Sequence, residues 1–232
     1  MNLQVGRDQV VISACQLGRQ APESPRWLFR DVTFEIRAGQ RWVMAGPSGA
    51  GKTILLRAMA LLDPVDEGEI HWLGGPVAAV DIPVYRSTVM YVSQRPALVD
   101  GTVLDNLQLP FRLAAHRAKR YDDATVDRML HALGRSQDFL QKRRRDLSGG
   151  EALLVTITRA LQLSPMVLLL DEPTAALDAL TQQQCERLVE QWLDEVATRT
   201  MVWVSHDDSQ TRRIGRQRFY VSDGRLAVQA DA

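Results

Sequence analysis

The chain has 232 residues, of which 45% are hydrophobic, and its 28 Lys and Arg residues balance 28 Asp and Glu residues. This composition excludes a disordered chain, which would be poorer in apolar residues and would carry a charge excess, and it disfavours a free-standing nucleic-acid binder, which is usually basic. No apolar run approaches the roughly 18 residues of a membrane span, and residues 1–10 contain no apolar signal core. Cys15 and Cys185 form no disulfide framework and show no metal-ligand spacing, so we expect a soluble intracellular protein. We expect both cysteines to be buried small residues.

The first half of the chain alternates short apolar runs with turns and one polar loop, residues 19–26. These runs predict five strands, at residues 10–14, 32–36, 41–45, 69–73 and 89–92. Residues 54–62 are apolar on almost every face, which predicts a buried helix that ends at Asp63 and Pro64.

The second half begins with a change of pattern. Apolar residues at mostly helical spacing predict a helical insert over residues 103–145, which ends in four basic residues. Further elements are predicted as a helix from about 148 to 163, a strand at 167–170, a helix at 181–196, a strand at 200–204 and a hairpin near 223–224. Strands that alternate with helices around an insert predict an α/β fold with a parallel core.

A glycine-rich stretch follows the strand predicted at residues 41–45. It matches the P-loop pattern G-x-x-x-x-G-K-[ST] and consists of Gly46, Pro47, Ser48, Gly49, Ala50, Gly51, Lys52 and Thr53. Glycines let the backbone approach phosphate oxygens with its N–H groups, and the following helix N-terminus favours the same anion. The pattern predicts nucleotide binding, with Lys52 on the β- and γ-phosphates and the Thr53 hydroxyl on Mg²⁺.

Two carboxylates end the strand predicted at residues 167–170. Asp171 is placed to hold Mg²⁺ directly or through water, and Glu172 is placed to orient or deprotonate an attacking water as a general base. Alone, the pattern would equally fit a core strand that runs out to solvent. After a P-loop, a nucleotide-hydrolysing site is the better interpretation.

A third motif is Leu147-Ser148-Gly149-Gly150-Glu151. With the first two motifs it resembles the signature sequence of ABC-type ATPases. Gln94, Asp178 and His206 follow in matching order, so the resemblance spans residues 10 to about 224. It implies a P-loop ABC ATPase core, a parallel-rich sheet with flanking helices, plus an antiparallel β subdomain. It also implies one nucleotide-binding domain, residues 1–232, with a helical subdomain inserted at about 95–146.

The resemblance further implies a head-to-tail homodimer that encloses two ATP molecules. Ser148, Gly149 and Gly150 of one subunit would contact the γ-phosphate held by the P-loop of the other, and Asp178 would communicate across the dimer. Gln94 would sense Mg²⁺ and the γ-phosphate, and His206 would contact the γ-phosphate and the attacking water. A serine followed by two glycines at a helix start agrees with this role, because it presents backbone N–H groups to an anion.

The sequence departs from the family pattern at two places. Leu153 and Leu154 stand where the family usually has Gln and Arg, and we expect both leucines to be buried. The loop after the first strand has no aromatic residue to stack on adenine. Arg19 or Trp27 could fill that place, although we favour Trp27 as a core or surface residue.

Three functions are compatible with these motifs: an ATPase subunit of a membrane transporter, a non-transport ABC ATPase acting on nucleic acid or ribosomes, and a small-molecule phosphotransferase. The phosphotransferase has no use for Asp178 or His206. The non-transport ATPases need coiled-coil insertions or two fused cassettes, whereas this chain has one P-loop and one signature. Basic runs at 112–120, 142–145 and 212–218 could suggest nucleic acid or anionic lipid, but we favour solvated helix faces.

The transporter interpretation implies partners and a location. We expect separate integral-membrane subunits, whose short coupling helices contact the groove that includes residues 95–106, and no nucleic acid. The chain would lie peripherally on the cytoplasmic face of the inner membrane. Residues 101–110 and 202–207 are similar to ATPase subunits of small Fet-type exporters associated with iron. Phosphate and amino-acid importer ATPases share much of the same sequence and remain the alternative.

Overall fold

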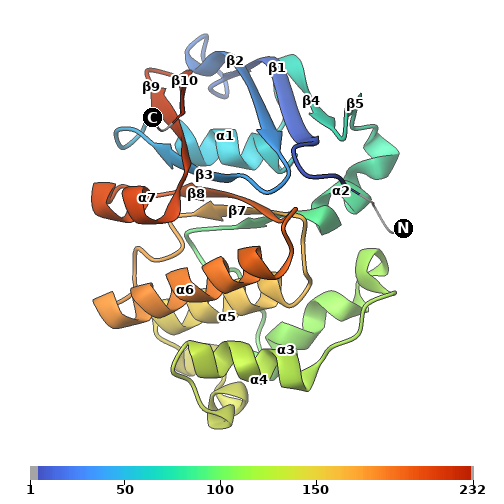
Figure 1. Cartoon of the computed structure of the whole chain (residues 1–232), viewed down its shortest axis with the longest axis vertical. Coiled ribbons are helices and arrows are strands. Elements are labelled where there is room, and N and C mark those ends of the chain that lie inside the picture. The colour runs from blue at the N-terminus through green and yellow to red at the C-terminus, as the bar shows by residue number, and fades with distance from the viewer. Residues whose placement is uncertain (1–4, 231–232) are drawn as a thin grey trace.

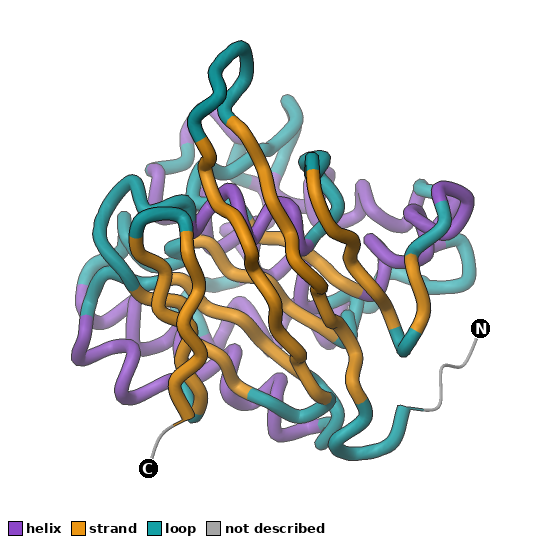
Figure 2. Tube along the Cα trace, turned by 90° about the horizontal axis from the view of Figure 1, so that it is seen from above, coloured by secondary structure: helices purple, strands orange, loops and turns teal. Residues whose placement is uncertain are grey.

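The computed structural model describes residues 5–230, so both ends of the predicted domain 1–232 lie outside the described residues. Two sheets form the framework (Figure 1). The antiparallel sheet has the order β2-β1-β4-β5, with β1 (Val10–Gln20), β2 (Trp27–Arg37), β4 (Glu67–Trp72) and β5 (Gly75–Pro76). Figure 2 shows its long strands from above. Because β1 continues to Gln20, the connection between its first two strands is shorter than the loop 19–26 that the sequence predicts.

The second sheet is mainly parallel and has the order β10-β9-β3-β8-β7-β6. It consists of β3 (Arg41–Ala45), β6 (Val89–Val92), β7 (Val167–Asp171), β8 (Thr200–Val204), β9 (Gln217–Ser222) and β10 (Arg225–Ala230). Every residue of β7 and β8 is buried, as their continuous apolar runs predict for strands covered on both faces. Among the described strands of this sheet, β9 and β10 form the one antiparallel pair, which confirms the predicted terminal hairpin.

The described residues form seven α-helices. They are α1 (Lys52–Met59), α2 (Ile82–Thr88), α3 (Val103–Gln108), α4 (Asp123–Ala132), α5 (Gly149–Leu161), α6 (Ala179–Glu195) and α7 (Asp208–Ile214). Figure 1 shows α1 between the two sheets, and α5 and α6 below the parallel sheet. No helix within residues 5–230 is long and apolar enough to cross a bilayer.

Three hydrophobic clusters connect these layers. The largest fills the space between the sheets around α1, and the second packs the parallel sheet against α5 and α6. The third lies between residues 98 and 155 and joins α3 and α4 to Val155 of α5. Between α2 and α5, α3 and α4 are accompanied by four short 3₁₀ helices, at Leu109–Arg112, Ala114–His116, Gln137–Gln141 and Arg144–Asp146.

Two expectations about single residues have different outcomes. Leu153 and Leu154 are buried, with exposed fractions of 1% and 0%, as the sequence predicts. Of the two cysteines, Cys185 is buried but Cys15 is exposed, so the prediction that both are buried is wrong. Cys15 lies on β1 of the antiparallel sheet, and the side chains of alternate strand residues point to opposite faces of such a sheet.

Candidate functional site

Four parallel strands end at the same edge of the second sheet, and each is followed by a residue singled out from the sequence. The P-loop follows β3, Gln94 follows β6, Glu172 follows β7 and His206 follows β8. Ligand sites of open α/β sheets form outside the carboxyl ends of their strands. The strand order therefore brings together residues that are far apart in the sequence.

The P-loop wraps around the amino end of α1. Gly51 precedes the helix with a φ of 98°, a left-handed conformation that favours glycine. Lys52 is 5% exposed, and its Nζ donates hydrogen bonds of 2.8 Å to the carbonyl oxygens of both Gly46 and Pro47. Burial lowers the pKa of the Lys52 ammonium, while the nearby carboxylates of Glu172 and Asp171 oppose that shift.

Asp171 is buried and accepts two hydrogen bonds. The Thr53 hydroxyl donates to its Oδ1 at 3.0 Å, and the Tyr91 hydroxyl donates to its Oδ2 at 2.8 Å. Burial and the adjacent Asp171 carboxylate raise the pKa of Tyr91 above its ordinary value, so this phenol stays a donor. Tyr91 was missed by the sequence reasoning, because the pairing of its strand, β6, with β7 becomes visible only in the folded chain.

Glu172 lies between two polar side chains. Gln94 Nε2 donates to its Oε2 at 2.9 Å, and His206 Nε2 lies 2.5 Å from its Oε1. The backbone N–H of Glu172 also donates to the carbonyl of Val204 on β8. This hydrogen bond connects the start of the loop after β7 with the end of β8. Six predicted residues thus form one contiguous group, called here the P-loop cluster: Lys52, Thr53, Gln94, Asp171, Glu172 and His206.

The remaining predicted residues lie at two helix starts. Ser148 caps α5, because its Oγ accepts from the backbone N–H of Glu151 while the Glu151 carboxylate accepts from the backbone N–H of Ser148. Asp178 caps α6, where its carboxylate accepts hydrogen bonds from the Thr181 backbone N–H and from the Thr181 hydroxyl. Across residues 5–230, no hydrogen bond or ion pair joins Ser148, Gly149, Gly150 or Asp178 to the P-loop cluster.

Both candidates for an adenine contact have partners within the chain. Arg19 Nη1 forms a 2.9 Å ion pair with Asp63, so its guanidinium is engaged. Trp27 is half-buried, and the Arg30 guanidinium lies 4.5 Å from the centre of its ring.

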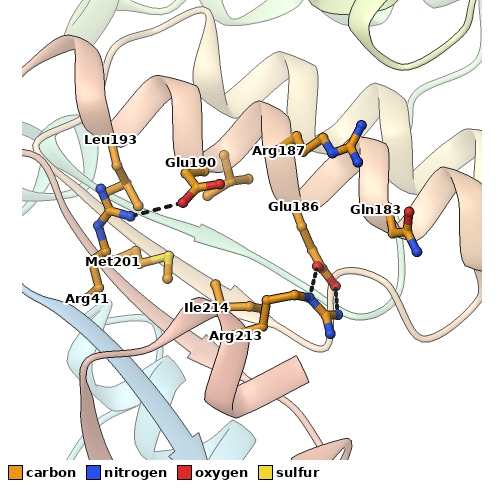
Figure 3. A pocket seen from close by; sticks show the side chains of 10 residues that line it. Arg41, Gln183, Glu186, Arg187, Glu190, Leu193, Met201, Arg213 and Ile214 are labelled. Atoms are coloured by element: carbon orange, nitrogen blue, oxygen red, sulfur yellow. Dashed lines mark hydrogen bonds and ion pairs between the residues drawn. The ribbon is translucent and has the colours of Figure 1, made fainter. Parts of the chain in front are cut away.

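A separate cavity of about 240 Å³ lies between α6 and α7 (Figure 3). None of its lining residues belongs to the P-loop cluster. Arg213 and Glu186 form one of its two ion pairs, and Arg41 and Glu190 form the other.

Comparisons with known proteins agree with this geometry. Residues 29–175 match the family described as ABC transporter. YjkB of Bacillus subtilis, described as an ABC transporter ATP-binding protein, is 34% identical over 204 residues, covering 88% of this chain and 79% of YjkB. FetA of Escherichia coli, described as a probable iron export ATP-binding protein, is 33% identical over 183 residues, covering 79% of this chain and 80% of FetA.

Solved structures give the same result. The dimeric post-hydrolysis structure of the ATP-binding cassette MJ0796, bound to ADP and Pi, superposes with a TM-score of 0.82 at 25% identity, covering 94% of this chain and 98% of that one. Fold and site together define a P-loop ATPase of the ABC type. The chain belongs to the ABC transporter family, and it is an ATP-binding and ATP-hydrolysing subunit that powers a membrane transporter.

Proposed function

We propose that this chain is the motor of a transporter whose pore is formed by separate integral-membrane subunits. The single observation that carries this proposal is the P-loop cluster, in which Lys52, Asp171, Glu172 and His206 converge at one sheet edge. In this proposal the chain associates peripherally with the cytoplasmic face of the inner membrane, and short helices of the pore subunits contact the region of residues 95–106. It has no nucleic-acid partner.

The nucleotide is ATP, and residues 46–53 surround its phosphates. Backbone N–H groups of the loop and of the α1 start bind the phosphate oxygens, and the Lys52 ammonium binds the β- and γ-phosphates. To do so, Lys52 exchanges its two carbonyl partners for phosphate oxygens, which are stronger acceptors because they are charged.

The oxygens of Thr53, Asp171 and Gln94 suit Mg²⁺, a hard cation that prefers hydroxyl, carboxylate and amide oxygens. The hydrogen bond from Thr53 to Asp171 shows that two of these side chains already meet. When bound, Mg²⁺ neutralises charge that develops on the phosphates during hydrolysis.

Hydrolysis depends on Glu172 and the two residues beside it. The Glu172 carboxylate orients and deprotonates the attacking water. His206 contacts the γ-phosphate and keeps that carboxylate in place, because its ring nitrogen lies 2.5 Å from Glu172 Oε1. Gln94 connects the same carboxylate to the segment that leads into α3.

The second half of the site comes from another copy of the chain. Ser148, Gly149 and Gly150 form the start of α5, whose N–H groups favour an anion, and they contact the γ-phosphate bound to the partner's P-loop. Asp178 lies at the start of α6 and communicates across the same dimer. This arrangement explains why these residues have no bond to the P-loop cluster of their own chain.

We propose metal export, with iron as the first candidate, as the transport process. FetA aligns over 80% of its own length. Import ATP-binding proteins for sulfate and molybdate match at similar identity, but over only 56% and 58% of their lengths. Import of phosphate or amino acids is the competing assignment, and association with a permease that requires a periplasmic binding protein would establish it instead.

Affinity purification of the tagged chain from detergent-solubilised membranes tests the transporter assignment. We expect an integral-membrane protein in stoichiometric amount and ATP hydrolysis by the recovered complex. The Lys52→Ala chain, purified in the same way, should recover the partner without the hydrolysis. Recovery of ribosomes or nucleic acid in place of a membrane protein would contradict the proposal.

A further inference from the structure

A buried glutamine bonds to both loops that carry the hydrolytic residues of the P-loop cluster. Gln210 on α7 is 2% exposed, and its amide contacts three different parts of the chain. Its Oε1 accepts from the Ser205 hydroxyl at 2.6 Å, and its Nε2 donates to Thr174 Oγ1 at 2.9 Å and to Glu186 Oε1 at 2.7 Å. Both N–H groups of the amide therefore have partners, which is what a buried polar side chain requires.

Two of these partners belong to the loops that carry the hydrolytic residues. Ser205 immediately precedes His206, and its Oγ also accepts from the backbone N–H of Asp207 at 3.0 Å. Thr174 lies two residues after Glu172, in the turn where the Ala175 backbone donates to the Glu172 carbonyl. One amide group thus connects the loop after β7 with the loop after β8.

The third partner of the Gln210 amide is the carboxylate of Glu186, which is ion-paired with Arg213. Glu186 on α6 is 8% exposed, and its carboxylate accepts from Arg213 Nε at 2.8 Å and Nη2 at 2.9 Å, as Figure 3 shows. Burial raises the pKa of Glu186, but hydrogen bonds from Arg213, Gln210 and Gln182 outweigh burial, so the net pKa lies below its usual range. Because a buried carboxylate with several donors has little freedom, it fixes the orientation of the Gln210 amide.

We propose that Gln210 is a positioning residue for ATP hydrolysis, which holds the loops of Glu172 and His206 in register so that the two side chains meet. The inference rests on the proposed roles of these two residues. The contact between Glu172 and His206 requires both loops to keep their relative position, and small displacements of reacting groups lower rates strongly. Within residues 5–230, no hydrogen bond joins Gln210 to Lys52 or Thr53, so we expect nucleotide binding to be independent of Gln210.

Steady-state kinetics of the full chain test the proposal. We expect Gln210→Met to lower kcat for ATP hydrolysis on the order of tenfold, with KM for ATP within about twofold of wild type. Thr211→Val is the matched control, because Thr211 is equally buried on the same helix, while its hydroxyl bonds to Asp208 and Arg218 and to neither catalytic loop among the described residues. A kcat that falls no further in Gln210→Met than in Thr211→Val would overturn the proposal.

An exchange of side chains separates positioning from simple loss of stability. Gln210→Glu alone places two carboxylates side by side, so we expect kcat to fall as it does for Gln210→Met. Combined with Glu186→Gln, the pair can bond again, since the new amide donates to the new carboxylate and Ser205 and Thr174 donate to it as well. The double variant should recover most of the wild-type kcat. A double variant as slow as the single one would contradict the positioning role.

Hydrogen exchange of backbone amides tests the positioning role of Gln210 without a measurement of ATP turnover. In Gln210→Met, backbone amides of residues 172–178 and 204–210 should exchange faster, while those of residues 46–59 should be unchanged. Unchanged exchange in the two loops would overturn the positioning role even in an active enzyme. Absence of ATP hydrolysis in the wild-type complex would instead overturn the proposed function, and the exchange data would still test Gln210.

Discussion

Glu172 is held in an uncommon backbone conformation at the point where the hydrolytic site is assembled. Its φ is 48°, in the left-handed region that few residues other than glycine adopt. Such conformations persist where surrounding contacts impose them, and here Gln94, His206 and the Val204 carbonyl all bond to Glu172. In this turn the Glu172 carboxylate contacts Gln94 and His206, whereas the Asp171 carboxylate contacts Thr53 and Tyr91. Two adjacent acids thereby obtain separate partners.

Lys52→Ala tests the role of a single P-loop side chain in nucleotide binding. We expect the affinity for ATP to fall about tenfold or more, because charge-assisted hydrogen bonds contribute about 1.5–3 kcal/mol. Isothermal titration of the purified chain with ATP gives the measurement. Lys119→Ala is the control, since Lys119 donates to the Leu163 carbonyl and has no bond to the P-loop. Equal affinities of wild type and Lys52→Ala would disprove the phosphate role.

The motif residues were predictable from the sequence because each motif is a short run of neighbouring residues whose types indicate its chemistry. Tyr91 and Gln210 could not be predicted so easily. A tyrosine within a strand and a glutamine four residues after His206 carry no pattern of their own. Their importance comes from strand order and helix packing, which bring them to Asp171, Thr174 and Ser205 only in the folded chain.

Among the elements, α5 shows how a departure from a family pattern can be absorbed by packing. Leu154 is fully buried in the cluster between the parallel sheet and α6, and Leu153 is 1% exposed. The polar pair that the family usually has at these positions would need polar partners, whereas two leucines only need burial. The carboxyl half of α5 is accordingly apolar on the face that meets the sheet.

Leu154→Arg restores the residue that is usual in the family, and we expect it to destabilise this chain. It would bury a charge without a partner, which costs about 3 kcal/mol or more. Urea unfolding followed by circular dichroism measures the change. Leu180→Arg, at a position that is 66% exposed, should have little effect. A stability of Leu154→Arg equal to wild type would show that the helix has a polar partner at this position.

A charge cluster fixes the end of α1 relative to β1. Asp63 accepts from Arg57 at 2.8 and 2.9 Å and forms an ion pair with Arg19. The hydrogen bonds from Arg57 lower the pKa of Asp63 below its usual range, with burial opposing them. A carboxyl whose folded pKa is depressed stabilises the fold above its ordinary pKa, and this stability is lost as the pH falls through the folded value.

Asp63→Asn should therefore cost about 2 kcal/mol of unfolding free energy at pH 7. The difference from wild type should shrink as the pH falls below the ordinary carboxyl pKa of about 4, because the unfolded wild-type chain then binds a proton that the folded carboxylate does not. Denaturant titrations at several pH values provide the comparison. Asp81→Asn, on an exposed residue without an ion pair, is the control. A cost that is independent of pH would exclude an electrostatic origin.

For the whole molecule, the strand predictions and the α/β character followed from apolar runs and from the alternation of strands with helices. The order of the sheet did not follow from these patterns, because β9 returns to pair with β3 on the side away from β8, and β10 then pairs with β9. Residues 103–145 were predicted as a helical insert, yet much of this segment consists of 3₁₀ turns. Pro110 lies in one of these turns, where proline removes a backbone donor that a longer helix would need.

Glu172→Gln tests the assembly of two copies. We expect ATP binding within about twofold of wild type, turnover at least about a hundredfold slower, and an ATP-dependent dimer. Size-exclusion chromatography with light scattering, with and without ATP and Mg²⁺, measures the dimer. Combining Glu172→Gln with Lys52→Ala should abolish it. A Glu172→Gln chain that stays monomeric at saturating ATP would remove the main support for a shared site.

The first glycine of the P-loop has a consequence for how the protein is made. A Cβ at Gly46 would lie 2.0 Å from the carbonyl oxygen of Val221, so the loop rests on the backbone of β9. β3 likewise lies between β8 and β9, both of which come from the last part of the chain. During translation, the phosphate-binding segment leaves the ribosome long before the strands that support it. The nascent chain therefore completes the support of its nucleotide site only after β8 and β9 have been synthesised.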